Sequence, residues 1–259
     1  MRINKYLAQI GIASRRSVDL MVEEGRIKIN NQVAKLGDQT DPLTDKISID
    51  GNKIGDRQEQ KVYIILNKPV GYISTAAKIK GEKNVLELVN PSYSSSERSE
   101  SRSSKKKFST RSNNNIPRLY PVGRLDKDST GLILLTNDGE LTQKITHPKF
   151  HIPKTYEVKA LGNVDDHKIE IMQKGVVLED GKTKPADVKI ISKSLPRHSI
   201  FQITLYEGKK RQIRRMAAAL HIHIIDLKRI SIGPIQIGGL PLGKFRNLTK
   251  EEIKSLTTD

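Results

Sequence analysis

Apolar residues recur along the chain with two periods, one typical of helices and one typical of strands. Apolar residues at helical spacing predict a short helix over residues 2–10. A second helix, over about 15–24, is predicted to begin after Ser14, a residue type that caps helix N-termini. Alternation over Ile27–Val33, interrupted by two asparagines, predicts a hairpin, and a last strand of this region is predicted at Ile47–Ile49.

Strand patterns dominate from residue 62 onward. The predicted strands cover 62–66, 72–74, 132–136, 154–160, 175–178, 186–191, 200–206 and 224–232, and the predicted helices cover 84–89, 140–145, 165–174 and 212–220. Short turns join many neighbouring strands, so we expect a mixed, mostly antiparallel sheet with helices on its flanks, an α+β fold. The predicted organisation is a small module over 1–50, a polar linker over 51–61 and a larger domain over 62–259.

One internal segment has a different composition. Residues 92–113 contain ten serines, six Lys or Arg and two Glu, with no apolar period. Such a segment cannot form a core and is predicted to be a disordered insertion in a loop. A second interpretation is a basic arm that follows RNA phosphates.

Composition narrows the function classes. The formal net charge of +17 indicates a polyanionic partner, of which nucleic acid fits best. The chain has no cysteine, which excludes disulfides, thiolate nucleophiles and cysteine-bound zinc. No apolar run is long enough to span a membrane and the N-terminus lacks the apolar core of a signal peptide, so we expect a cytoplasmic protein.

The most informative stretch is Pro121–Leu135, which carries Asp126 between a Gly-Arg-Leu lead and a turn predicted to end at Gly131. A strand that follows directly would hold this loop rigidly. Arg124 and Lys127 flank Asp126 and favour an ionised carboxylate, which suits a general base or a nucleophile. The alternative is a carboxylate that only completes a turn or caps a helix.

Tyr156 lies on a predicted strand, where a flat ring with a polar tip can stack on a nucleobase. The alternative is a half-buried sheet tyrosine. Five of the ten residues over 207–216 are basic. This helix start is predicted either to hold phosphates or to contribute to the site through Arg214, which lies next to Ile213, a residue expected on the buried face of the helix. A guanidinium there needs an acidic partner, and we expect that partner to be Asp126.

The motifs G-R-L-D, K-T-Y and E-G-K-K-R-Q-I-R-R-M, with N-K-P-V-G upstream, resemble those of the ribosomal RNA pseudouridine synthases of the RsuA/RluB group. About the first 50 residues, with R-I-K-I-N-N-Q-V-A, resemble the S-four-type RNA-binding module that many of these enzymes carry. The two resemblances cover nearly the whole chain apart from residues 92–113.

This resemblance implies a role for each matching residue. Asp126 is implied as the catalytic group, Tyr156 as the residue that stacks on the base, Arg214 as the salt-bridge partner of the catalytic carboxylate, and Arg124 as a contact to RNA around the flipped nucleotide. Further RNA contacts are expected from basic residues of the N-terminal module and of the 207–216 segment, namely Arg15, Arg16, Lys28, Lys209, Lys210, Arg211 and Arg215.

The implied reaction isomerises a uridine that has left the helical stack. Asp126 promotes cleavage of the ribose–nitrogen bond, by covalent attack or by removal of a ribose proton, and the uracil re-bonds through carbon 5. No cofactor or metal is expected, and we expect a monomer. L-T-N-D-G-E-L and H-P-K-F favour a 23S-type over a 16S-type ribosomal RNA substrate. A non-catalytic RNA-binding or ribosome-assembly factor and a DNA-binding protein are the alternatives.

Residues 92–113 generate a first test. Because the segment adds a net four positive charges and cannot form a core, its deletion should leave folding and isomerisation intact while making RNA affinity less dependent on salt concentration. Affinities measured over a salt series for the full chain and the deletion give the two slopes. An unchanged slope would show that the segment makes no phosphate contacts, and loss of folding would show that its boundaries are wrong.

Overall fold

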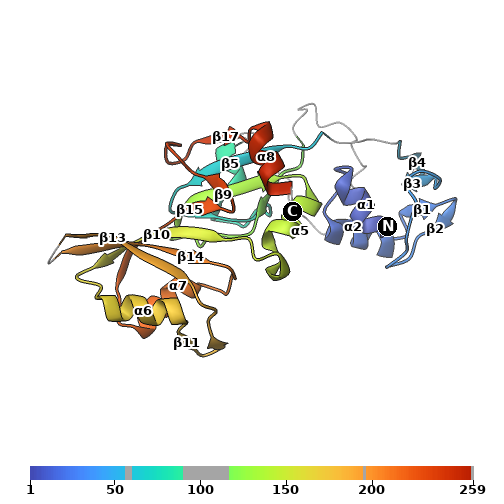
Figure 1. Ribbon diagram of the computed structural model, residues 1–259. Coiled ribbons are helices and arrows are strands. Elements are labelled where there is room, and N and C mark those ends of the chain that lie inside the picture. Colours follow the sequence, from blue (N-terminus) through green and yellow to red (C-terminus); the bar gives the residue numbers. More distant parts are fainter. Residues whose placement is uncertain (56–59, 90–116, 195–196, 258–259) are drawn as a thin grey trace. The chain divides into compact units, whose positions relative to one another are not determined.

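The computed structural model describes residues 1–55, 60–89, 117–194 and 197–257, in two compact units (Figure 1). The smaller unit is formed mainly by Met1–Val62, and the larger one by most described residues from Tyr63 onward. The segment predicted to be disordered, 92–113, lies outside the described residues. In the described part of the chain, no helix combines the length and the apolar character needed to cross a membrane.

The smaller unit packs two helices against a four-stranded sheet. The helices are α1 (Ile3–Gln9) and α2 (Arg15–Glu23), and the sheet, in order β2-β1-β3-β4, comprises β1 (Ile27–Ile29), β2 (Gln32–Val33), β3 (Ile47–Ile49) and β4 (Asn52–Lys53). The predicted cap is present, because the Ser14 hydroxyl accepts a hydrogen bond from the backbone N–H of Ser17 at 3.0 Å. The prediction that β3 is the last strand is wrong: Asp50 and Gly51 both have positive φ and turn the chain into β4.

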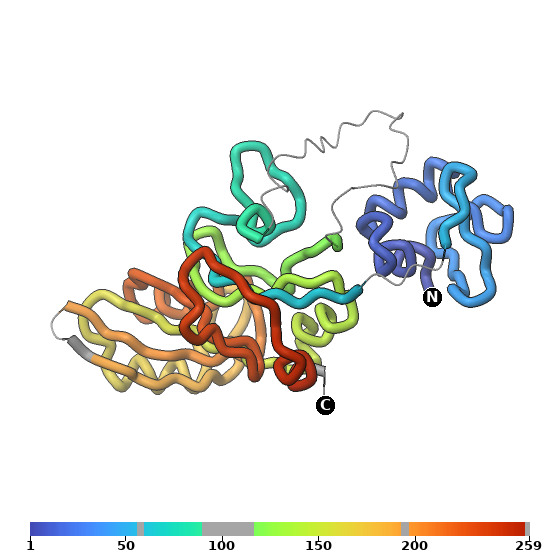
Figure 2. The backbone as a smooth tube through the Cα atoms, turned by 90° about the horizontal axis from the view of Figure 1, so that it is seen from above, coloured from blue at the N-terminus to red at the C-terminus, as the bar shows by residue number. Residues whose placement is uncertain are grey.

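The larger unit is built on a nine-stranded sheet. Its main strands, in spatial order, are β13 (Asp187–Ser194), β14 (His198–Leu205), β10 (Lys154–Leu161), β15 (Ile224–Ile232), β9 (Thr130–Thr136), β5 (Tyr63–Lys68) and β17 (Phe245–Asn247), with β16 (Ile235–Gln236) on β15 and β8 (Tyr120–Val122) on β9. All pairs are antiparallel except β15 with β9, so the predicted mixed, mostly antiparallel α+β fold is confirmed. In Figure 2 the red C-terminal segment, which carries β17, runs beside the central strands.

Two apolar cores stabilise this sheet. Helices α6 (Asp166–Lys174) and α7 (Gln212–Ala219) pack against β10, β13 and β14, with Met172, Phe201 and Met216 fully buried between them. Helices α5 (Gly139–Thr146) and α8 (Lys250–Thr257) pack against the central strands through Leu134, Ile145 and Leu256, among others. Figure 1 shows these helix pairs over different parts of the sheet. Because the apolar periods along these segments were clear, the helices at α6 and α7 were predictable.

Smaller elements complete the unit and correct two predictions. They are β6 (Tyr72–Ile73), β7 (Lys83–Asn84), α3 (Leu86–Val89), the 3-10 helix η1 (Pro148–Phe150), β11 (Val177–Leu178) and β12 (Gly181–Lys182). The strand predicted to end at residue 66 continues to Lys68, because β9 pairs with it along its whole length. Gly131 does not end a turn but lies inside β9, directly opposite Arg229 of β15 and Lys68 of β5.

The close approach of β15 makes Gly131 irreplaceable on steric grounds. A Cβ atom at Gly131 would lie 2.2 Å from the carbonyl oxygen of Arg229, and its φ of +103° disfavours any other residue. We therefore expect Gly131→Ala to lower the free energy of unfolding by about 2–4 kcal/mol, from overpacking and backbone strain together. Denaturant unfolding measures the change. The control is Gly239→Ala, where a Cβ meets nothing within 4 Å and φ is not positive. Equal effects of the two substitutions would contradict this account of β9.

Candidate active site

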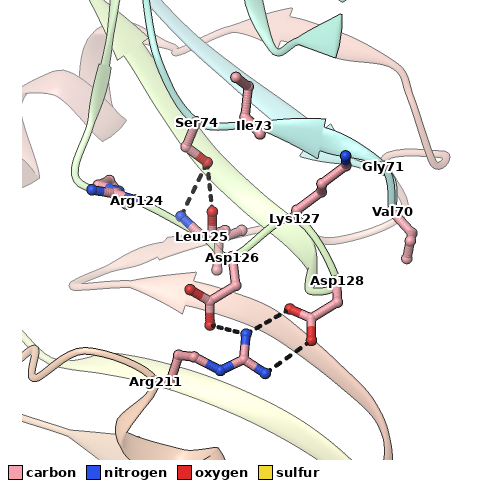
Figure 3. A pocket seen from close by; sticks show the side chains of 10 residues that line it. All are labelled: Val70, Gly71, Ile73, Ser74, Arg124, Leu125, Asp126, Lys127, Asp128 and Arg211. Carbon is pink, nitrogen blue, oxygen red and sulfur yellow. Dashed lines mark hydrogen bonds and ion pairs between the residues drawn. The ribbon is translucent and has the colours of Figure 1, made fainter. Parts of the chain in front are cut away.

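The loop between β8 and β9 presents Asp126 to a cavity of about 380 Å³. This volume lies in the ~300–1,000 Å³ range of small-molecule sites. The cavity is lined by Val70, Gly71, Ile73, Ser74, Arg124, Leu125, Asp126, Lys127, Asp128 and Arg211 (Figure 3). Two sequence segments thus meet here, the one that follows β5 and the one that precedes β9, together with the residue before α7.

The segment after β5 holds the Asp126 loop from one side. The Ser74 hydroxyl accepts a hydrogen bond from the backbone N–H of Leu125 at 3.1 Å and donates one to its carbonyl at 2.9 Å (Figure 3). The backbone N–H of Gly71 donates to the carbonyl of Lys127 at 2.9 Å. The residues on both sides of Asp126 are therefore fixed, which is the preorganisation that a reacting carboxylate requires.

Lys68 holds the same loop through hydrogen bonds to its backbone. Its side chain is fully buried, and its ammonium donates to the carbonyls of Ser129 at 2.8 Å, Pro69 at 3.0 Å and Lys127 at 3.4 Å. Within the described part of the chain it forms no ion pair with a carboxylate. Burial lowers the pKa of Lys68 to about 8, although the negative charges of Asp128 and Asp126 oppose that shift.

In the described part of the chain, Arg211 is the cation that lies within ion-pair distance of Asp126. Its Nη1 lies 3.6 Å from Oδ2 of Asp126, and its two Nη atoms donate to the carboxylate of Asp128 at 3.3 Å and 3.1 Å. Arg211 precedes α7 with a φ of +49°, a conformation uncommon for a residue with a side chain. This backbone geometry places the guanidinium between the two carboxylates, as Figure 3 shows.

Asp128 is a second carboxylate in the cavity. Burial alone would raise its pKa, but hydrogen bonds from Arg211 and the positive charges of Arg214 and Arg211 outweigh that effect and lower the pKa below its usual value. Asp128 is thus ionised at neutral pH and anchors both arginines.

The predicted pairing of Arg214 with Asp126 is wrong in this structure. Nη2 of Arg214 donates to the backbone carbonyl of Asp128 at 2.9 Å and to the hydroxyl of Ser129 at 3.3 Å, and lies 3.4 Å from the Asp128 carboxylate. Ile213 and Met216 face the core as expected, and Arg214 is only 18% exposed. Because α7 begins at Gln212, Arg214 lies in the first turn of the helix and contacts Asp128 and Ser129. Arg211, which precedes the helix, reaches Asp126.

The two cations predicted to flank Asp126 differ in position. Arg124 is exposed and lines the cavity. Lys127 points away from Asp126 (Figure 3). Its ammonium forms an ion pair with Glu82 at 2.6 Å. The positive charge beside Asp126 therefore comes from Arg211 and, beneath the loop, from Lys68, rather than from Lys127.

Tyr156 is half-buried on β10 and is not among the residues that line this cavity. It lies directly opposite Arg229 of β15, whose guanidinium carbon is 6.0 Å from the centre of the tyrosine ring. The pairing of β10 with β15 contains a bulge at this point, since Tyr156 pairs with Arg229 and Thr155 with Ser231. Bulges redirect side chains and often lie near active sites.

The basic residues predicted to contact RNA fall into two groups. Arg15 and Arg16, in the first turn of α2, and Lys28, on β1, are exposed in the smaller unit, and Lys210 and Arg211 are exposed in the larger unit. Arg215 and Lys209 have partners on the β11–β12 turn: Arg215 donates to both carboxylate oxygens of Asp180, at 2.8 Å and 3.2 Å, and Lys209 approaches the same carboxylate at 4.0 Å. These two residues brace the turn, and their role in RNA binding stays a prediction.

Four residues with clear contacts to the Asp126 loop or to Tyr156 were not assigned a role from the sequence: Lys68, Ser74, Asp128 and Arg229. Asp128 had a signal, since it is a second carboxylate two residues after Asp126 and close to the same arginines. Lys68 lies in the N-K-P-V-G motif, which gave it no chemical role, and Arg229 had no signal, because a single basic residue in a strand pattern indicates an exposed position.

Comparison with known proteins gives two family matches. Residues 62–219 match the RNA pseudouridylate synthase family, and residues 1–42 match the S4 domain. The chain is 38% identical over 258 residues to ribosomal large subunit pseudouridine synthase B of Bacillus subtilis (strain 168), covering 98% of this chain and 95% of that protein. It is 37% identical over 258 residues to the dual-specificity RNA pseudouridine synthase RluF of Escherichia coli O157:H7, covering 99% and 78%. A crystal structure of a pseudouridylate synthase superposes with a TM-score of 0.66 at 28% identity, covering 99% and 100% of the two chains.

The buried Lys68 makes the stability of the protein depend on pH. Its pKa is about 8 when folded and about 10.4 when unfolded. Between these values the unfolded chain binds more protons, so this group makes the free energy of unfolding rise with pH. Between about pH 7 and about pH 9.5, wild type should therefore gain roughly 1–3 kcal/mol relative to Lys68→Met.

Denaturant unfolding at the two pH values measures this gain. The control is Lys159→Met, which removes an exposed lysine of β10 and should differ from wild type by the same amount at both pH values. A wild-type minus Lys68→Met difference that stays constant with pH would show that the ammonium keeps its ordinary pKa.

Proposed function

Because the chain belongs to the RNA pseudouridylate synthase family, we propose that it converts a uridine of large-subunit ribosomal RNA into pseudouridine, with Asp126 as the catalytic group. The observation that carries the assignment of Asp126 is its position: an acidic side chain on a loop fixed on two sides, facing a cavity of about 380 Å³, with Arg211 at 3.6 Å.

The chemistry needs an ionised carboxylate beside the ribose of a uridine taken out of its stack. The bond between ribose carbon 1′ and uracil nitrogen 1 breaks, the uracil turns, and a bond forms between carbon 1′ and uracil carbon 5. The proton lost from carbon 5 is balanced by one gained at nitrogen 1, so the reaction is an isomerisation. Asp126 serves this sequence either as the nucleophile at the ribose or as the base that removes a ribose proton. That the reaction uses no cofactor or metal stays a prediction.

The surrounding charges suit these steps. Arg211 lies within ion-pair distance of Asp126. Arg214, which holds the loop at Asp128 and Ser129, would act by fixing the loop rather than by touching Asp126. Arg124 lines the cavity and is the candidate contact to the RNA that surrounds the flipped nucleotide. Tyr156 is proposed to stack on the base, which requires the base to extend beyond the cavity lining toward β10.

Binding would depend on a different set of residues. A net charge of +17 supports long-range attraction to RNA. In the smaller unit, which carries the match to the S4 domain, the exposed Arg15, Arg16 and Lys28 are proposed as phosphate contacts. In the larger unit Lys210 is the exposed candidate next to the site. We propose that the enzyme acts in the cytoplasm as a monomer.

The substrate proposal is supported by the 38% identical relative, whose name specifies the large ribosomal subunit. Pseudouridine mapping in both ribosomal RNAs, from cells with and without the gene, tests it. Loss of one modified position in the large-subunit RNA is expected. Loss of a position only in the small-subunit RNA would overturn the choice of subunit while leaving the reaction intact.

Asp126 generates the sharpest test of the chemistry. Asp126→Asn should lower the single-turnover rate of uridine conversion by more than about 10³-fold, because it removes the reacting group. RNA affinity should change less than about threefold, since the basic surface is unchanged. Filter binding and pseudouridine detection on the same RNA measure the two quantities.

The matched control is Asp128→Asn, which leaves the reacting carboxylate in place but weakens the anchor of Arg211 and Arg214. Losing a charged hydrogen bond costs ~1.5–3 kcal/mol, or about 10- to 100-fold in rate. A rate for Asp126→Asn that equals or exceeds that of Asp128→Asn would exclude Asp126 as the catalytic group.

A further inference from the structure

Arg229 occupies the centre of a row of residues that crosses four strands. Lys68 of β5 pairs with Gly131 of β9, Gly131 pairs with Arg229 of β15, and Arg229 pairs with Tyr156 of β10. Residues directly opposite each other in a sheet direct their side chains to one face. Gly131 has no side chain, so nothing from that strand separates the guanidinium of Arg229 from the loop that precedes β9.

The guanidinium is buried and bonded to the backbone of that loop and its strand. Arg229 is 2% exposed; its Nε donates to the carbonyl of Leu132 at 2.7 Å and its Nη1 to the carbonyl of Arg124 at 3.4 Å. Arg124 lies two residues before Asp126 and Leu132 lies inside β9. Arg229 thus ties the start of the catalytic loop to the strand that follows it.

The same guanidinium contacts the ring of Tyr156. Its central carbon lies 6.0 Å from the ring centre, within the range of a cation–π interaction. The bulge in β15 at Ile230 separates this pair from the next one, Thr155 with Ser231. The tyrosine ring therefore takes its place from Arg229 as well as from its own strand.

Stability does not explain the burial of this charge. Among the described residues Arg229 forms no ion pair with a carboxylate, and its buried Nη2 has no hydrogen-bond partner. Lys68 and Lys154, two more buried or half-buried cations, lie near enough to repel it. A buried charge without an acidic partner costs free energy, and an apolar side chain would fill the site at lower cost.

We propose that Arg229 is a positioning residue, which sets the Asp126 loop and the Tyr156 ring in one fixed relation. Its planar guanidinium can donate in its own plane to one carbonyl of the loop and one of β9 while one face meets an aromatic ring, a combination that the single ammonium of lysine does not offer. Displacing either partner by about 1 Å would cost on the order of 10²-fold in rate. The consequence for catalysis rests on the proposed roles of Asp126 and Tyr156.

The test compares Arg229→Lys, Arg229→Met, Tyr156→Leu and the double variants in single-turnover conversion, RNA affinity and thermal unfolding. Arg229→Lys should lower the rate about 10- to 100-fold with RNA affinity within about threefold of wild type. The rate loss of Arg229→Lys combined with Tyr156→Leu should be smaller than the product of the single losses, because the two residues act through one contact. The control is Lys228→Met, which removes a neighbouring lysine of β15 that is not paired with Tyr156 and should leave the rate unchanged.

A wild-type rate in Arg229→Lys, or independent rate losses in the double variant, would overturn the positioning role. If Arg229→Met does not fold, the Arg229→Lys series decides alone. A variant whose rate falls only because it unfolds is recognised by its melting temperature, and its rate would recover on cooling. Asp126→Asn is measured beside these variants: a wild-type rate there would refute the proposed function itself, whereas a wild-type rate only in the Arg229 variants would refute this inference alone.

Discussion

The site depends on hydrogen bonds from two buried cations to the backbone of one loop and of the strand that follows it. A loop that must present Asp126 to a cavity cannot satisfy its carbonyls as a helix or a strand does, and buried carbonyls without donors cost free energy. Lys68 donates to the carbonyls of Lys127 and Ser129, and Arg229 to those of Arg124 and Leu132. Carbonyls on both sides of Asp126 thus accept hydrogen bonds from positively charged side chains. The same two side chains therefore fix the shape of the loop and place positive charge next to it.

This arrangement accounts for the other constraints around the site. Gly131 lies between the two cations in the row across the sheet, and a Cβ there would collide with the backbone of Arg229. The negative charges of Asp128 and Asp126 oppose the lowering of the pKa of Lys68, so the acidic residues of the loop stabilise the charged form of this lysine. Arg211, which precedes α7, reaches both carboxylates, and Arg214 of α7 reaches that of Asp128. Hydrogen bonds from Arg211 and the positive charges of Arg214 and Arg211 keep the pKa of Asp128 below its usual value, in a protein whose net charge is +17.

Much of the fold was predictable because apolar periods are local. The helices α6 and α7 and the strands β10, β14 and β15 follow their patterns closely. The contacts of Arg211 and Lys68 within the site were not predictable, because both depend on residues that are distant in the sequence. Arg211 reaches Asp126 from a left-handed conformation that only the fold imposes. Lys68 is buried because β5 continues past residue 66 alongside β9, whose Gly131 pairs with Lys68, although the apolar pattern of the segment ends at Leu66. Asp126 itself was found because its loop motif is compact in sequence.

The buried cations lower the stability of the protein, but they fix the position of the Asp126 loop. The free energy of unfolding would rise if Lys68 lost its proton, because burial disfavours its charged form. Arg229 leaves one buried donor without a partner among the described residues. Both unfavourable contributions arise at side chains that contact the loop or its strand, and not at side chains of the two apolar cores. Apolar replacements at these positions could therefore leave the fold intact or even stabilise it, while the loop carbonyls lost their donors and Asp126 its fixed place. Selection for stability alone would then remove these cations, so their presence next to Asp126 is better explained by the geometry that the reaction requires.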